Sequence, residues 1–106
     1  MGSVVAQSQA RDLLKALADP LRLQIIESLS NGEKCVCDLI AEIGLAQSKI
    51  SFHLKVLKES GLITDRQSGR WVYYKLDIGA LNELQLWLKQ LTQDCQKSSA
   101  SCENNA

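Results

Sequence analysis

The strongest constraint on the fold is a change of hydrophobic period at Gly61. Residues 47–60, before this glycine, carry apolar side chains at three- and four-residue spacing, which predicts a helix with an opposite polar face. Residues 62–76, after it, are rich in β-branched and aromatic side chains on both sides of Ser68-Gly69, which predicts a hairpin. The chain is therefore predicted to be mainly α, with a β-hairpin that follows a helix.

Three further helices are predicted before this one. Residues 8–18 have an apolar stripe, and Asp19-Pro20 is a strong start signal for a second helix, because Asp caps free amides and Pro fits the first turn. A short third helix opens at Cys35 or Cys37 and ends at Gly44. A short helix, a glycine-containing turn and a polar-faced helix form a helix-turn-helix, and the hairpin after it is a wing.

A last helix is predicted over residues 78–93, with an apolar surface too wide for so short a chain to cover. We expect a second copy of the chain to cover it. Residues 1–95 are predicted to form one DNA-binding and dimerisation domain. The polar, aperiodic residues 96–106 are predicted to be a flexible tail that contains a cysteine.

The charge distribution favours a nucleic-acid partner for the middle of the chain. Twelve basic and twelve acidic residues cancel overall, but residues 44–76 carry a net charge of +4 and each flank carries −2. The composition, 45% hydrophobic and 23% charged over 106 residues, argues against disorder and against a multidomain enzyme.

The polar face of residues 47–60 is predicted to enter the DNA major groove, where Gln47 suits adenine and Lys49 suits guanine or phosphate. Arg66 and Arg70 are predicted at the hairpin tip, where they would touch backbone or minor groove. The alternative is an ordinary surface helix whose polar side is only solvated. The predicted DNA contacts are Gln47, Ser48, Lys49, Ser51, Phe52, His53, Lys55, Arg66, Gln67 and Arg70.

Catalysis has little support in the sequence. His53 is the only histidine and lacks a visible nucleophile and orienting acid, so it is interpreted as a packing or DNA-contacting residue. Paired carboxylates, a phosphate-binding glycine loop and a serine-centred elbow are absent. No apolar run reaches the roughly 20 residues of a membrane span. The sequence therefore predicts a protein that is neither an enzyme nor membrane-bound.

The cysteines are the sharpest chemical feature. No export signal is visible, so we expect a reducing cytoplasm, where thiols indicate metal or redox chemistry. Cys35-Val36-Cys37 places two thiols at a helix start, a position expected to lower their pKa and to favour soft metals. The alternative is a pair of small buried hydrophobes without a ligand. Cys95 and Cys102 lie near the end of the chain and are able to complete a site or to form a separate one.

Four segments resemble the ArsR/SmtB family of winged-helix metalloregulatory repressors. They are residues 18–23, 33–39, 47–55 and 59–63, and the likeness extends over about residues 8–95. The resemblance implies a homodimer built on the first and last helices. It also implies binding of an inverted-repeat operator and repression of transcription until an inducer binds.

The inducer implied by the resemblance depends on which thiols are present. Ile40 stands where similar arsenic sensors have a third cysteine. Cadmium and lead sensors use cysteines in the N-terminal arm, but in this chain no cysteine precedes Cys35. Zinc sensors use histidines on the last helix, which this chain lacks there. Trivalent arsenic or antimony is therefore the leading inducer, because sulfur is available and imidazole is not. The predicted ligands are Cys35, Cys37, Cys95 and Cys102.

Other interpretations stay open at this point. The same repressor fold can sense cadmium, lead or zinc, or it can respond to oxidation or persulfide formation through a bridge between thiols. Outside that class stands a small dithiol enzyme or metal-buffering protein that does not bind DNA.

Overall fold

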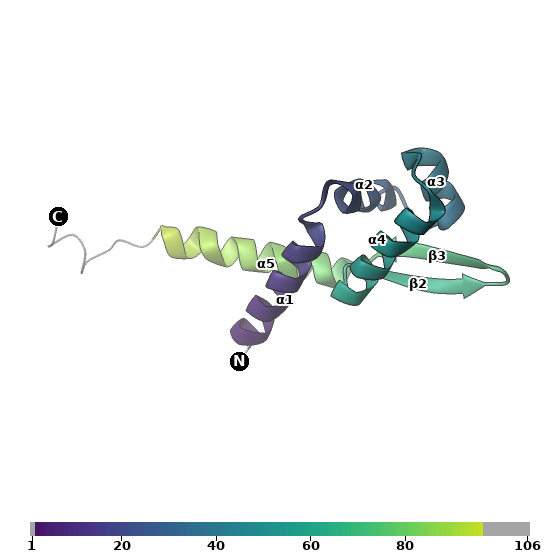
Figure 1. Cartoon of the computed structure of the whole chain (residues 1–106). Coiled ribbons are helices and arrows are strands. Elements are labelled where there is room, and N and C mark those ends of the chain that lie inside the picture. Colours follow the sequence, from purple (N-terminus) through teal and green to yellow (C-terminus); the bar gives the residue numbers. More distant parts are fainter. Residues whose placement is uncertain (1, 97–106) are drawn as a thin grey trace, which may run out of the picture.

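The computed structural model describes residues 2–96, over which the chain forms five helices and a three-stranded antiparallel sheet (Figure 1). The elements in chain order are α1 (Gly2–Leu17), α2 (Pro20–Leu29), β1 (Lys34–Cys35), α3 (Val36–Ile43), α4 (Gln47–Ser60), β2 (Ile63–Ser68), β3 (Trp71–Leu76) and α5 (Ile78–Cys95). The predicted fold class, mainly α with a hairpin wing, is confirmed.

Capping residues that can be recognised in the sequence determine where α2 begins and where α4 ends. Asp19 caps α2, and its Oδ1 accepts hydrogen bonds from the backbone N–H groups of Leu21 at 2.8 Å and Arg22 at 3.2 Å. The bond from Arg22 is the largest cause that holds the pKa of Asp19 below its usual value. α4 ends at Gly61, whose φ of +93° is a left-handed conformation that few other residues adopt.

The turn of the hairpin lies one residue later than predicted. Ser68 pairs with Trp71, so the two turn residues are Gly69 and Arg70 rather than Ser68 and Gly69. A two-residue turn between strands needs positive φ at its first position, and Gly69 supplies it with a φ of +63°. Arg66 consequently lies within β2, opposite Tyr73, and the prediction that it sits at the tip is wrong.

A short strand, β1, was not predicted. Lys34 pairs with Tyr74 and Cys35 pairs with Tyr73, which places β3 in the centre of the sheet in the order β1-β3-β2. β1 therefore joins the segment before α3 directly to the wing.

The core lies where α4 packs against the other helices and the base of the hairpin. α1, α2 and α3 each contact α4, and α1 also packs against α5. The fully buried large side chains at its centre are Ile25, Leu39, Ile50, Leu54, Leu57, Leu62 and Ile63. The predicted apolar stripe of α4 is thus buried, which turns the remaining face of this helix outward.

The helix α5 leaves much of its apolar surface exposed. Figure 1 shows it running out from the body on the side opposite to the hairpin. Leu81 and Leu84 pack against the core, but Leu86, Leu88 and Leu91 are each about half exposed. These leucines are the surface that the predicted dimer would cover. Among residues 2–96, no helix is long and apolar enough to cross a membrane.

Candidate nucleic-acid interface and thiol pocket

The outward face of α4 presents the predicted DNA-reading residues to solvent. Its exposed side chains are Gln47, Ser48, Lys49, Ser51, Phe52 and Lys55. Phe52 is 58% exposed. Ala46 precedes the helix, and its methyl group has no acceptor for the amides of the first turn. The Lys49 amide donates to the backbone oxygen of Ala46 at 3.1 Å, and the amides before it in the turn are positioned for an anion such as phosphate.

His53 lies on the opposite side of the same helix. Its side chain is 6% exposed, its Nδ1 is 3.3 Å from a guanidinium nitrogen of Arg22, and its ring meets Phe52 edge to face. This is the position of a packing residue, the first of the two roles that the sequence left open. His53 lies on the face of α4 that packs inward, as do Ile50, Leu54 and Leu57.

Two of the central basic residues are already paired within the chain. Lys58 Nζ lies 2.9 Å from Asp65, and the guanidinium of Arg66 donates to both carboxylate oxygens of Glu33, at 2.8 and 2.7 Å. These bonds raise the pKa of Lys58 and lower that of Glu33. Such pairs reduce the charge that these groups offer to a phosphate.

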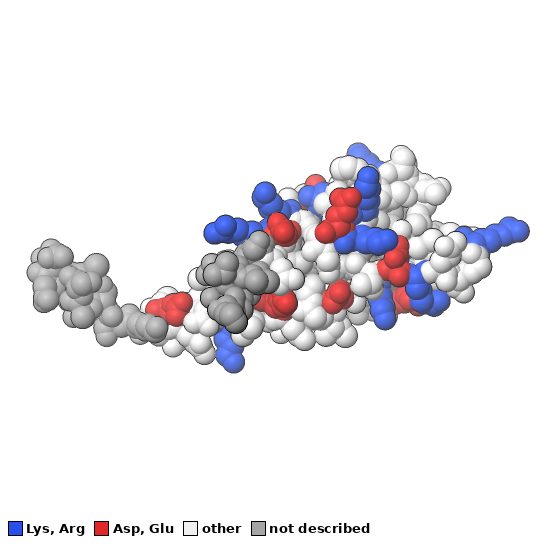
Figure 2. Space-filling model, turned by 90° about the horizontal axis from the view of Figure 1, so that it is seen from below, with Lys and Arg blue, Asp and Glu red and all other residues white. Residues whose placement is uncertain are grey.

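The remaining basic groups on α4 and at the turn point outward. Lys49, Lys55 and Arg70 are exposed and take part in none of the ion pairs found within the described part of the chain. Figure 2 shows that the outermost tip at the hairpin end is basic, whereas acidic and basic groups are mixed over the body. Exposed basic groups outside these ion pairs therefore lie on α4 and at the wing tip.

Arg66 is held in place as a structural residue of the wing. Besides its two bonds to Glu33, its guanidinium lies over the ring of Tyr73, 4.8 Å from the ring centre. Gln67, the next residue, is exposed and donates a hydrogen bond of 3.4 Å to the backbone oxygen of Gly69. Of the hairpin residues predicted to reach DNA, Arg70 is the one that the turn itself carries.

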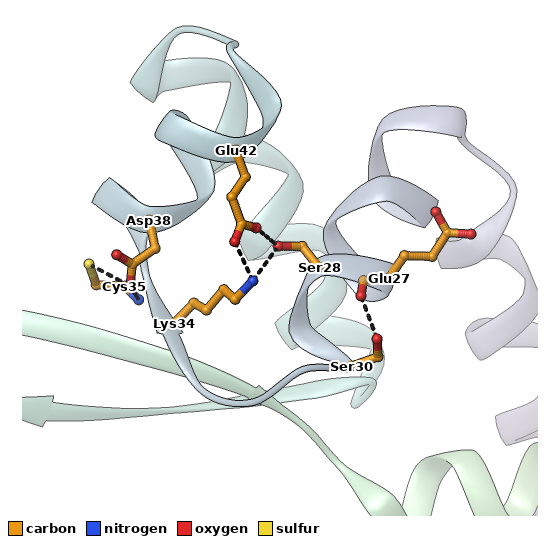
Figure 3. Close-up of polar contacts among 7 residues, drawn as sticks. All are labelled: Glu27, Ser28, Ser30, Lys34, Cys35, Asp38 and Glu42. Atoms are coloured by element: carbon orange, nitrogen blue, oxygen red, sulfur yellow. Dashed lines mark hydrogen bonds and ion pairs between the residues drawn. The ribbon is translucent and has the colours of Figure 1, made fainter.

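The paired thiols lie at the junction of β1 and α3. Cys35 is the N-cap of α3 and is buried, whereas Cys37, in the first turn, is exposed. Asp38 accepts a hydrogen bond of 3.1 Å from the backbone N–H of Cys35 and one of 3.4 Å from its thiol (Figure 3). Asp38 thus fixes the orientation of the first thiol.

The pKa of Cys37 moves in the direction opposite to the prediction. A hydrogen bond with the Cys35 thiol, followed by desolvation and the charge of Cys35, raises the pKa of Cys37 above its usual value. A backbone hydrogen bond lowers it but does not prevail. Competition between two adjacent thiols outweighs the helix terminus, so the expected lowering is wrong for Cys37 and its sulfur carries a proton at neutral pH.

A network of polar contacts ties the thiol segment to α2. Lys34 Nζ donates to Ser28 Oγ at 3.1 Å and to the carboxylate of Glu42, which also accepts from the Ser28 hydroxyl (Figure 3). These bonds lower the pKa of Glu42 and keep it ionised. Residues 33–35, the segment that includes the first thiol, therefore contact α2, α3 and the wing.

The thiols open into a hollow shared with α4 and the wing. Its volume is about 510 Å³. Gln47 at the start of α4 and Arg70 at the wing tip line it together with both thiols. Its full lining is Cys35, Val36, Cys37, Ile40, Gln47, Arg70, Trp71, Val72 and Tyr74. A ligand on the thiols would therefore lie between α4 and the wing.

Cys95 does not join this pair within one chain. It is exposed at the end of α5, which Figure 1 places at the far side of the molecule from α3. Over residues 2–96 no group of three potential metal ligands comes together. Cys102 lies outside the described residues. Of the four predicted thiols, the three that the structure describes thus divide into a pair at α3 and one cysteine at the end of α5.

Comparison with known proteins identifies the family. The family model for the arsR family of bacterial regulatory proteins matches residues 19–65, the stretch from the cap of α2 through β1, α3 and α4 into β2. The arsenic resistance transcriptional regulator ArsR2 of Pseudomonas putida is 40% identical over 85 residues, which are 77% of this chain and 69% of that protein. The chain belongs to the ArsR family.

Other relatives agree with this membership. The arsenical resistance operon repressor of Escherichia coli K12 is 54% identical over 65 residues, which are 60% of this chain but only 56% of that relative. The structure of an ArsR-like transcriptional regulator from Rhodococcus sp. RHA1 aligns with a TM-score of 0.82 over 100% of this chain and 97% of that chain, at 21% identity. The second likeness shows that this ArsR-family chain has the winged helix-turn-helix fold.

The raised pKa of Cys37 gives a prediction for this ArsR-family protein. With Cys95 and Cys102 changed to Ser, the rate at which iodoacetamide alkylates Cys37 is measured as a function of pH. The rate is expected to rise with pH, with a midpoint at a higher pH than for a free thiol. In Cys35→Ala the midpoint is expected to move to lower pH, because the main cause of the raised pKa is removed. Mass spectrometry of the modified peptide gives the rates.

Val36→Ala is the matched control, because it changes the neighbouring side chain and leaves both thiols. Its profile should equal that of the parent protein. A midpoint in Cys35→Ala that stays in place or moves to higher pH would contradict the assignment of the raised pKa to the thiol pair.

Proposed function

We propose that this chain is a cytoplasmic, homodimeric transcriptional repressor that binds operator DNA and releases it when cysteine thiolates bind trivalent arsenic or antimony. The observation that carries the proposal is the shared hollow, in which Cys35 and Cys37 face the same space as Gln47 of α4 and Arg70 of the wing. The names of the relatives, repressors and regulators of arsenic resistance, support the same function.

The DNA-binding part of the proposal rests on the outward face of α4. A helix in the major groove reads bases with its N-terminal residues, and Gln47, Ser48 and Lys49 occupy that end. Lys55 lies further along the same exposed face, and Arg70 extends the basic surface to the wing tip. The uncapped first turn adds backbone amides for a phosphate.

The homodimer rests on the exposed leucines of α5, with Leu14 of α1, which is 37% exposed. A two-fold arrangement through α1 and α5 would bury these side chains and present two α4 helices to one face of an inverted repeat. Half-sites would then lie one helical turn apart, roughly 34–36 Å. Operator spacing of this kind follows from the symmetry of the protein.

The inducer part rests on the chemistry of the thiols. Sulfur ligands suit soft ions such as trivalent arsenic and antimony better than magnesium or calcium. In the proposed mechanism, ligation at Cys35 and Cys37 shifts the start of α3 and, through β1, the wing. Cys95 and Cys102 supply further thiolates, from the partner subunit or at a second site. A coupling of about 1–3 kcal/mol, or roughly 5–150-fold in operator affinity, is sufficient for release.

The DNA contact is tested by the salt dependence of binding. Lys49→Ala is expected to weaken operator binding and to reduce the slope of log affinity against log salt concentration by about 1.8, the value for two lost phosphate contacts, one in each subunit of the dimer. Fluorescence anisotropy of a labelled operator measures both. Lys89→Ala, an exposed lysine of α5, is the control and should leave the slope unchanged. Equal slopes for the two variants would reject α4 as the DNA-binding helix.

The inducer site is tested by arsenite titration of the protein–operator complex. Cys35→Ser is expected to abolish or strongly weaken release, because one of two thiols in the hollow is lost. Cys95→Ser in the same assay reports whether the end of α5 contributes. Release that is unchanged in both variants would reject the thiol site. Cadmium, zinc and an oxidant in parallel titrations compare the other inducers under the same conditions.

A further inference from the structure

We infer that Phe52 makes this chain select DNA sites by the C5-methyl group of a thymine, which its exposed ring contacts in the major groove. This inference rests on the proposed function and specifies which base the surface of α4 selects. It is carried by the position of the ring among polar side chains, by the contact that holds the ring and by the chemistry of a phenyl group.

Phe52 lies in the middle of the exposed face of α4, and its side chain is 58% exposed. Ser48 and Lys49 lie four and three residues before it, and Lys55 lies three residues after it. All three are exposed, and this spacing places them on the same side of the helix as Phe52. A helix that brings Ser48 and Lys49 to DNA therefore brings the ring of Phe52 into the same groove.

The ring of Phe52 rests against a neighbour that is itself held in place. It meets the ring of His53 edge to face, with the ring centres 5.3 Å apart and the planes at 70°. His53 is 6% exposed, and its Nδ1 lies 3.3 Å from Nη1 of Arg22 in α2. Nε of Arg22 donates a hydrogen bond of 2.5 Å to the backbone oxygen of Ala16. The ring is thus partly ordered before DNA binds, which reduces the side-chain entropy that binding costs.

A phenyl ring can select only one feature of a base edge in the major groove. It forms no conventional hydrogen bond, so the donors and acceptors that distinguish guanine, adenine and cytosine offer it no partner. Thymine alone among the four bases presents a methyl group there. A polar base edge placed under the ring would lose water without gaining a hydrogen bond, which is unfavourable. Phe52 therefore favours thymine over the other three bases.

The neighbours of Phe52 have the complementary role. The ammonium groups of Lys49 and Lys55 suit phosphates, which fix the helix in the groove without reading the sequence. The alternative for Phe52 is a ring that is only solvated, since single exposed apolar side chains are common on protein surfaces. That alternative predicts affinity that does not depend on the methyl group of any thymine through Phe52.

The test begins with the selection of binding sites from random-sequence duplex DNA by the full chain. Each thymine of the selected site is then replaced in turn by deoxyuridine, which removes the methyl group and keeps the base pair. At the thymine under the ring, this change is expected to weaken binding about fourfold in one half-site and about fifteenfold in both, as for one buried methyl-sized group in each. Fluorescence anisotropy measures the affinities.

A second substitution in the DNA separates the methyl group from the base pair that carries it. Cytosine paired with guanine at the same position is expected to bind weakly. 5-Methylcytosine, which restores only the methyl group, is expected to bind about fourfold more tightly than cytosine. Equal affinities for cytosine and 5-methylcytosine would contradict the methyl contact.

Protein variants assign the effect to Phe52. Phe52→Ala is expected to bind the thymine and uracil sites equally, and Phe52→Leu, which keeps an apolar group, should retain part of the preference. Lys55→Ala is the matched control on the same face, because it should weaken binding to both sites and keep their ratio. This ratio compares two DNAs on one protein, so a general loss of stability does not change it. A preference that persists in Phe52→Ala would overturn the inference.

The outcome is separable from that of the proposed function. Failure of the chain to select any DNA sequence would contradict the repressor function and this inference together. Selection of a site at which no thymine methyl group affects the affinity would support DNA binding and overturn this inference alone.

Discussion

The pairing of β1 with β3 is the interaction on which the arrangement of the site depends. Two residues, Lys34 and Cys35, join the start of α3 to the middle strand of the sheet through Tyr73 and Tyr74. Without this pairing the hairpin would still contact α2, α3 and α4, but no strand ladder would join it to the segment before α3. With it, the thiols, α4 and the wing line one hollow.

The contacts around β1 strengthen the same junction from three sides. Glu33 holds Arg66 of β2 with two hydrogen bonds, Lys34 binds Ser28 of α2 and Glu42 of α3, and Asp38 holds the amide of Cys35. Exposed ion pairs of this kind contribute little stability individually. Their value here is geometric, because a shift of the thiol segment must move or break contacts to both the wing and α2.

The sequence predicted the elements whose signals are local. The start of α2 is predicted by Asp19-Pro20, and α4 is predicted by its apolar stripe and by Gly61 at its end. The change to β-branched and aromatic residues after Gly61 predicts the hairpin. β1 could not be predicted, because two residues show no period and their strand is defined only by a distant partner. The turn was misplaced by one residue because both Ser68-Gly69 and Gly69-Arg70 contain the required glycine.

The candidate site was predicted in its residues but not in its grouping. Spacing alone identified Cys35 and Cys37, yet their separation from Cys95 depends on the direction in which α5 leaves the body. The helix terminus predicts a lowered pKa for Cys37, but the hydrogen bond with the neighbouring Cys35 thiol raises it. The ion pair of Arg66 with Glu33 could not be predicted, because Glu33 lies 33 residues earlier in the chain.

The central claim is that a ligand on Cys35 and Cys37 acts on the wing and α4 through β1. Hydrogen exchange of the backbone amides, measured with and without a trivalent arsenical, tests it most directly. The account predicts altered exchange in β1, in β3 around Tyr73 and in the first turn of α4, and none of these changes in a Cys35→Ser/Cys37→Ser protein. Changes confined to the end of α5 around Cys95 would contradict it.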